Sequence, residues 1–196
     1  MINNGKAALV AAALITMMSC AQKNETQTDS RYIGPSDIKV DDGRMTPEVL
    51  LSLGRLSDPQ LSPDGRWILY GVSYTSIEEN RSCRNLFLTE VTKNENGGFA
   101  FGDKVQLTAE GKSVSNARWS NDGKSIYYLQ GGQIFNSAIT IAGGKASLSD
   151  RKQISDIEAG IGEFSLSPDQ TQVLYTSTIP GAVKTPKDFD EKLDKA

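Results

Sequence analysis

The sequence predicts an all-β fold, an incomplete β-propeller of about two and a half four-stranded blades with a short N-terminal helix. Three repeated segments support this prediction: LSPDGRWILY at residues 61–70, WSNDGKSIYY at 119–128 and LSPDQTQVLY at 166–175. Each begins as a tight turn and continues into a run that is apolar on both faces, which is typical of a strand buried between two sheets. Their spacing of roughly 50 residues is typical of propeller blades.

The turn in the first repeat can be derived from its residues. Pro63 fixes φ at the first central position of a type I turn, Asp64 suits the second, and Gly65 can leave in a left-handed conformation. The Ser62 hydroxyl can bond to backbone groups of the turn. Each copy is therefore expected to join an outgoing strand to a doubly buried one. The alternative is three unrelated β-hairpins in a sandwich, since such turns occur in any β protein.

Residues 45–54 are expected to form the helix that precedes the first blade. Thr46 suits the N-cap, Pro47 the first helical position, and Glu48 the positive end of the helix. Three aliphatic residues give the segment an apolar face, and Gly54 can end it.

The strands follow from the apolar runs and the turn residues between them. They are expected at 59–62, 67–73, 85–91 and 104–108, then at 115–120, 125–130, 133–141 and 152–154, and then at 162–166 and 172–178. Because a closed propeller has about four to eight blades, we expect this chain either to be part of a longer polypeptide or to complete its ring with another chain. The expected divisions are blades at 45–178, with repeats at 59–73, 117–130 and 164–178, and a truncated connection at 179–196.

The N-terminus predicts export and lipidation. Residues 7–18 form an apolar run that is too short to span a bilayer but suits a secretory signal. Ser19 and Cys20 end this run in a pattern that resembles the lipobox of bacterial lipoproteins, which predicts a signal peptide at 1–19 and a lipid on Cys20. Residues 20–44 are polar and are expected to form a flexible tether that first docks at 32–35. The alternative is an ordinary secretory signal with a cysteine nearby.

The segment MTPEVLLSLGRLSDPQLSPDGRW, residues 45–67, resembles the N-terminus of bacterial prolyl-oligopeptidase-family serine peptidases of the dipeptidyl and acylaminoacyl peptidase type. Its GRLSDPQ part is the more specific signal, because TolB-like propellers also repeat SPDG. The resemblance covers about residues 45–190. It implies an N-terminal propeller that gates the active site and admits short peptides, followed by an α/β-hydrolase domain with a Ser-Asp-His triad.

The chain itself offers few candidates for chemistry. It contains no histidine and no Gly-x-Ser-x-Gly segment, so we expect no catalytic residue, metal site or cofactor within it. Glu78 and Glu79 are candidates for substrate binding, since a Glu pair on the propeller of related dipeptidyl peptidases binds the free amino end of the substrate. A solvated loop tip is the simpler interpretation of this pair. Cys83 is expected to be a small buried strand residue.

The sequence thus predicts the propeller portion of a cell-envelope serine exopeptidase, anchored to a membrane through its N-terminal lipid, with short peptides as substrates of the full-length protein and with the hydrolase domain missing from this chain. The net charge of −3 and the lack of a basic cluster argue against nucleic-acid binding. One alternative is a non-enzymatic, TolB-like lipoprotein that binds envelope proteins through its propeller. Another is the product of a split gene, which would have no stable fold.

Overall fold

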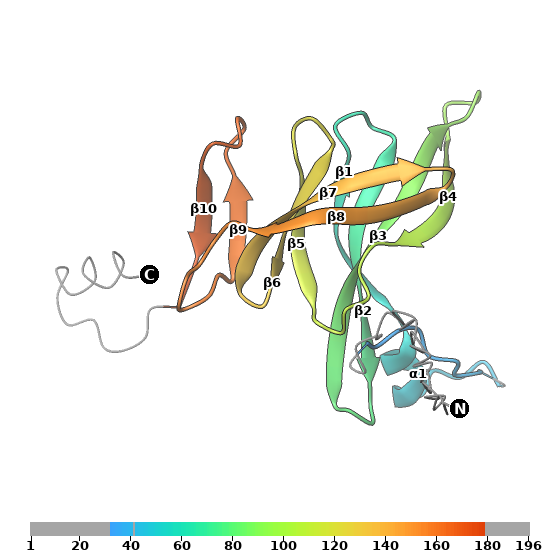
Figure 1. The fold of residues 1–196 in the computed structure, drawn as a ribbon. Coiled ribbons are helices and arrows are strands. Elements are labelled where there is room, and N and C mark those ends of the chain that lie inside the picture. The colour runs from blue at the N-terminus through green and yellow to red at the C-terminus, as the bar shows by residue number, and fades with distance from the viewer. Residues whose placement is uncertain (1–31, 41, 179–196) are drawn as a thin grey trace, which may run out of the picture.

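The computed structural model describes residues 32–40 and 42–178, and these fold into three antiparallel sheets that follow one another along the chain (Figure 1). After helix α1 (Pro47–Ser52), the first four-stranded sheet holds β1 (Arg55–Leu61), β2 (Trp67–Ser76), β3 (Arg81–Lys93) and β4 (Phe99–Gln106). The second holds β5 (Val114–Trp119), β6 (Ser125–Gln130), β7 (Gln133–Ala142) and β8 (Lys145–Gln153). The third pairs β9 (Glu163–Leu166) with β10 (Val173–Thr176).

This arrangement confirms the predicted fold class as an all-β, propeller-like domain. Each four-stranded sheet is a meander in which every strand pairs with the next one in sequence. The three repeated segments lie in three different sheets, whereas unrelated hairpins of a sandwich would share sheets.

The repeated turns have the same hydrogen bonds in all three sheets. The hydroxyl of Ser120 donates to Asp122 Oδ1 at 2.6 Å and accepts from the backbone N–H of Ser125 at 2.9 Å. The backbone N–H of Gly123 closes the turn on the carbonyl of Ser120, and Gly123 has a φ of 68°. The same bonds recur at Ser62 and Ser167. The sequence motif therefore encodes one device that starts the second strand of every sheet.

The third turn replaces the glycine by Gln170, which adopts the same left-handed conformation with a φ of 56°. Its side chain compensates by joining two sheets. Gln170 Nε2 donates to the carbonyl of Trp119 at 2.9 Å, and its Oε1 accepts from the backbone N–H of Asn121 at 3.0 Å. The departure from glycine thus supplies a contact between the second and third sheets.

The apolar cores lie between neighbouring sheets, as the doubly apolar strands predict. The first core joins the first two sheets through Leu69, Leu86, Leu88, Val114, Ala117, Trp119, Ile126 and Tyr128. The second core joins the second sheet to the third through Leu129, Ile134, Ile161 and Phe164. A third core covers the opposite face of the first sheet and contains Ile33, Tyr70, Val72, Tyr74, Cys83 and Phe87. Cys83 is 1% exposed, which confirms its prediction as a buried strand residue.

An aromatic stack recurs in both four-stranded sheets. Tyr70 stacks on Phe87 with ring centroids 6.0 Å apart, and the Lys104 ammonium lies 5.0 Å from the Phe87 ring centroid. Tyr128 stacks on Phe135 at the same centroid distance of 6.0 Å, with the Arg151 guanidinium in place of the lysine. A cation on the fourth strand therefore packs over the central strands of each sheet.

The fourth strands differ from the prediction. β4 spans Phe99–Gln106 where 104–108 was expected, and β8 spans Lys145–Gln153 where 152–154 was expected. Most residues of both strands are exposed, because the buried core between the first two sheets takes its residues from β2, β3, β5 and β6 and leaves these outer strands at the surface. An outer strand of this kind lacks the apolar run by which the sequence reveals the inner ones.

The helix is also shorter than predicted. It spans Pro47–Ser52, with the Thr46 hydroxyl accepting from the backbone N–H of Val49 at 3.3 Å as an N-cap. Gly54 does not end the helix, since Leu53 is already extended. A side chain at Gly54 would lie 2.7 Å from Tyr74, so packing against β2 is what requires a glycine there.

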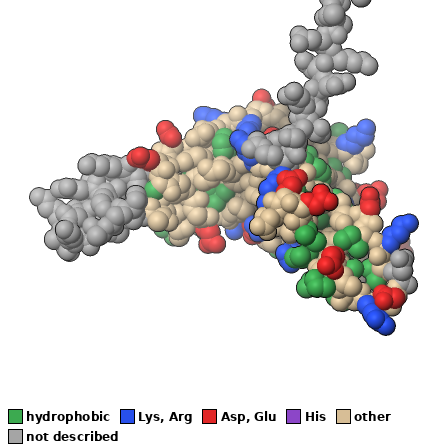
Figure 2. All heavy atoms as spheres, turned by 90° about the horizontal axis from the view of Figure 1, so that it is seen from below, with side chains coloured by type: hydrophobic (Ala, Val, Ile, Leu, Met, Phe, Trp, Pro, Cys, Tyr) green, Lys and Arg blue, Asp and Glu red, His purple; other side chains and the backbone are tan. Residues whose placement is uncertain are grey.

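The segment at 32–35 docks as predicted, because Ile33 is 6% exposed in the third core. Of the other predictions for the N-terminal region, the signal peptide and Cys20 lie outside the described residues. Within the described ranges, no helix is long and apolar enough to cross a membrane. Figure 2 shows charges of both signs scattered over one face, with hydrophobic side chains gathered mostly toward the end of the molecule that carries α1. Met45, Leu50 and Leu53 are exposed there.

Candidate functional site

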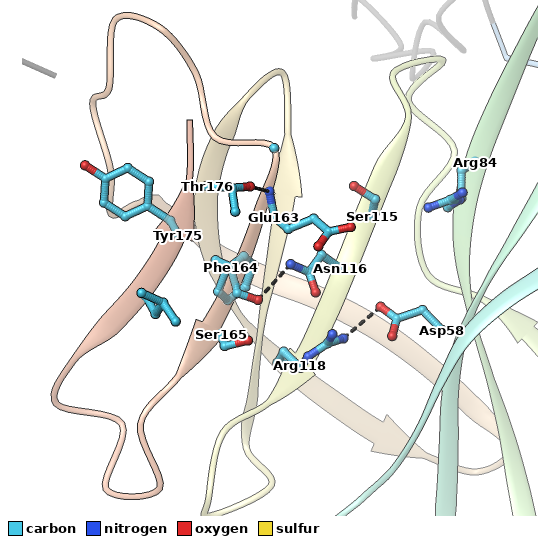
Figure 3. Close-up of a pocket in the computed structure, with 12 residues that line it drawn as sticks. Asp58, Arg84, Ser115, Asn116, Arg118, Glu163, Phe164, Ser165, Tyr175 and Thr176 are labelled. Carbon is cyan, nitrogen blue, oxygen red and sulfur yellow. Dashed lines mark hydrogen bonds and ion pairs between the residues drawn. The ribbon is translucent and has the colours of Figure 1, made fainter. Parts of the chain in front are cut away.

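A polar cleft of about 550 Å³ lies where the first strands of the three sheets come together (Figure 3). Asp58 comes from β1, Asn116 and Arg118 from β5, and Glu163 from β9. Arg84 reaches the cleft from β3. The first strand of each blade lines the inner wall of a propeller, which is where such proteins form their central cavity.

Two β-bulges aim side chains at this cleft. The pairing of β1 with β2 shifts between Ser57 and Gln60, and the pairing of β5 with β6 shifts between Ser115 and Arg118. Within these bulges Asp58 and Asn116 are left-handed, with φ values of 52° and 50°. Asp and Asn tolerate this conformation better than other residues with a side chain. A bulge re-aims the side chain it carries, so both polar groups point into the space between sheets.

An ion pair ties the first two sheets together at the cleft. Arg118 Nη1 lies 2.7 Å from Asp58 Oδ2 and also donates to its neighbour's carbonyl, at Ala117. The two side chains are 29% and 31% exposed. Asn116 Nδ2 donates to the carbonyl of Phe164 at 2.9 Å, which joins the second sheet to the third. Figure 3 draws both bonds across the cleft. The wall is therefore held by polar contacts as well as by the apolar cores.

Two other charged side chains of the cleft form no ion pair among the described residues. Arg84 donates from Nε to the Ser73 hydroxyl at 3.1 Å, which leaves its terminal nitrogens without an ion pair among the described residues. The carboxylate of Glu163 likewise makes no ion pair within that part of the chain, although its backbone N–H donates to the Thr176 hydroxyl. The cleft thus presents one cation and one anion that are free to meet a polar ligand.

The residues singled out from the sequence lie elsewhere. Glu78 and Glu79 are exposed in the turn between β2 and β3, and Glu79 Oε2 lies 2.6 Å from Arg81 Nε. Neither lines the cleft. Their role in binding the amino end of a substrate stays a prediction.

Sequence reasoning missed the cleft residues, although a signal was present. Asp58, Asn116 and Glu163 each stand four residues before the repeated serine of their sheet. Aligning the repeats toward their N-terminal side would have shown a carboxylate or amide at one shared position of the inner strands.

Fold and cleft together describe a propeller-like domain with a polar inner wall, and comparison with known proteins relates it to peptidases. The chain is 33% identical over 154 residues to dipeptidyl-peptidase 5 of Porphyromonas endodontalis, covering 77% of this chain and 20% of the relative. It is 35% identical over 154 residues to dipeptidyl-peptidase 5 of Porphyromonas gingivalis, covering 78% and 20%.

A weaker match is uncharacterized peptidase YuxL of Bacillus subtilis, at 25% identity over 138 residues, 69% of this chain and 19% of the relative. No family model matches the chain. The chain spans about a fifth of the length of the curated relatives it matches. These similarities support a relationship with the peptidase family that contains dipeptidyl-peptidase 5.

Proposed function

We propose that this chain is the propeller portion of a cell-envelope serine exopeptidase that hydrolyses short peptides. The propeller would gate the active site or select the substrate. A Ser-Asp-His triad would have to come from residues outside this sequence, because the chain contains no histidine. The observation that carries the proposal is the identity of 33% over 154 residues with a dipeptidyl-peptidase 5.

The cleft supports the selecting role. Its volume of about 550 Å³ suits a ligand of a few residues. Its lining combines charged side chains with polar ones such as Ser115 and Ser165, which a peptide can use for hydrogen bonds. A folded protein would be excluded from such a space by size.

Isolation of the native protein tests the proposal. An antibody against residues 42–178 recovers the protein from cell envelopes, and its mass is compared with the 21.2 kDa of this chain. We expect a larger product that hydrolyses dipeptidyl nitroanilides and is inactivated by a serine-directed fluorophosphonate. A product close to 21.2 kDa with no hydrolysis would contradict the peptidase proposal and favour a TolB-like binding lipoprotein.

The envelope location is proposed from Cys20. Lipid on this cysteine would hold the protein on a membrane. Metabolic labelling with an alkynyl fatty acid is expected to mark the wild-type protein and not the Cys20→Ala variant, with Cys83→Ala as the control that keeps its label. Equal labelling of both variants would argue against lipidation at Cys20.

Glu78 and Glu79 are proposed to bind the free amino end of the substrate. In the active full-length enzyme, the Glu78→Gln and Glu79→Gln double variant is expected to raise KM for dipeptidyl nitroanilides. Glu95→Gln, in an exposed turn of the same sheet, serves as the matched control. An unchanged KM in the double variant would contradict this role, and the two residues would then be charged residues of a solvated loop only.

A further inference from the structure

The four charged side chains that line the cleft form one ion pair and one separated pair of opposite charges. Asp58 and Arg118 neutralise each other across 2.7 Å. Arg84, on the first sheet, and Glu163, on the third, have no ion-pair partner within 4.0 Å among the described residues. Figure 3 shows them on opposite sides of the cleft, with Ser115 between them. Such an arrangement favours a ligand with an anionic and a cationic end.

Arg84 is held in place before any ligand binds. Its Nε donates to Ser73 Oγ, and its backbone N–H donates to Ser113 Oγ at 3.2 Å. The side-chain stem crosses Gly71, where a Cβ would lie 2.9 Å from Arg84 Cδ. A guanidinium whose Nε is engaged keeps its two terminal nitrogens for an end-on fork to a carboxylate. Because the stem is already packed, little side-chain entropy is lost on binding.

We propose that this cleft binds the free C-terminal carboxylate of a short peptide through the terminal nitrogens of Arg84, with Glu163 favouring ligands that also carry a positive charge. The class of ligand rests on the proposed peptidase function, whereas the site rests on the geometry of these residues. A free dipeptide carries both charges within a few ångströms of each other. The site would therefore retain or sense small peptides at the inner wall.

Binding of a dipeptide and of its amide tests the proposal. Ala-Ala and Ala-Ala-amide differ only in the terminal carboxylate, and each is titrated into the full chain while the backbone NMR signals of Asn116 and Phe164 are followed. We expect Ala-Ala to bind about ten-fold more tightly than the amide, as charge-assisted hydrogen bonds predict. Acetyl-Ala-Ala, which lacks the cationic amine, is expected to bind more weakly than Ala-Ala. Equal affinity of Ala-Ala and its amide would overturn the proposal.

Two substitutions assign the effect to Arg84. Arg84→Met keeps a stem over Gly71 and is expected to remove the preference for the free carboxylate. Arg84→Lys keeps the charge without the fork and is expected to retain part of it. The matched control is Arg66→Met, since Arg66 pairs with Glu90 at 3.2 Å and lies outside the cleft. A carboxylate preference that persists in Arg84→Met, with the signals of a folded chain, would refute the assignment.

Kinetics separate this inference from the proposed function. In an active full-length enzyme, free Ala-Ala is expected to inhibit nitroanilide hydrolysis, and Arg84→Met to raise its Ki about ten-fold. The control variant Arg66→Met, which lies outside the cleft, is expected to leave both this Ki and the KM for the nitroanilide unchanged. Carboxylate-selective binding without any peptidase activity would support the site and defeat the peptidase proposal. Peptidase activity with equal binding of dipeptide and amide would defeat the site and leave the peptidase proposal standing.

Discussion

Removal of the Ser120 hydroxyl tests whether the repeated turn is a source of stability. Ser120 is 6% exposed, and its Oγ accepts the backbone N–H of Ser125 at 2.9 Å. Alanine at this position leaves that N–H without its acceptor at the start of β6. We expect Ser120→Ala to destabilise the protein, and Ser62→Ala to do the same, because Ser62 is equally buried and accepts from Trp67 in the same way.

The size of the effect follows from the backbone N–H of Ser125, which is partly buried. A buried donor left without a partner costs about 1–3 kcal/mol, so we expect about 2 kcal/mol for Ser120→Ala. The bond from the Ser120 hydroxyl to the solvent-exposed carboxylate of Asp122 adds little to this energy, because water can replace it. Ser167 is less buried than Ser120, and we expect Ser167→Ala to cost about 1 kcal/mol.

Urea unfolding of the full chain measures these differences. With a slope of about 2 kcal/mol per molar urea, Ser120→Ala should lower the midpoint by roughly 1 M. Ser147→Ala, at an exposed position of β8, is the matched control and should leave the midpoint unchanged. A Ser120→Ala midpoint within error of this control, or a larger shift in Ser167→Ala, would refute the reasoning.

Three further predictions concern the turn and the contacts between sheets. The pKa of Asp122 is held below its ordinary value, first by the Ser120 hydroxyl and then by the backbone N–H of Lys124, so Ser120→Ala should raise it in a carboxyl NMR titration. Because the pKa of Asp122 is lower in the folded than in the unfolded protein, its carboxylate stabilises the fold above about pH 4, and this contribution is lost as pH falls through the folded pKa. Ser120→Ala should therefore lose less stability than the wild type on acidification. The same loss of stability in both proteins would contradict this prediction. Phe164→Ala should cost about 3 kcal/mol, because Phe164 is 3% exposed, with limited proteolysis showing faster cleavage of the third sheet. A double-mutant cycle on Asp58 and Arg118 should give a coupling of about 0.5–1 kcal/mol, and additive single effects would exclude a role for the pair.

The sequence predicted those parts of the fold in which one residue has one local task. The turn at Ser62 depends on a proline, a carboxylate and a left-handed glycine within four residues. The structure contains the bond from Ser62 to the Asp64 carboxylate and the left-handed Gly65, as predicted. The second strands of the first two sheets were visible because burial on both faces leaves a continuous apolar run. The prediction of a doubly buried strand was wrong for β10, which is mostly exposed, with Leu174 77% exposed. The fourth strands were misplaced, because exposure leaves them without a period that distinguishes strand from loop.

Apart from the position that Asp58, Asn116 and Glu163 share before the repeated serines, the cleft could not be predicted from local pattern, because its residues meet only across sheets. Arg84 and Glu163 lie far apart in the sequence, and nothing near either residue indicates the other. The conspicuous pair, Glu78 and Glu79, lies instead at an exposed turn outside the cleft. Adjacent charges in a sequence most often indicate a solvated loop, whereas an inner wall takes one polar residue from each strand.

The bulges of the inner strands connect the repeated turn with the polar cleft. In each of the first two sheets a left-handed residue, Asp58 or Asn116, interrupts the pairing of the first strand four residues before the turn serine. The turn fixes the register of the strands that follow, while the bulge releases one side chain from that register and directs it toward the neighbouring sheet. Each of the first two repeats therefore specifies both a blade and one polar contact of the inner wall. Replacement of Asp58 by a β-branched residue should disturb the wall more than replacement by glycine, since only the former opposes the left-handed backbone.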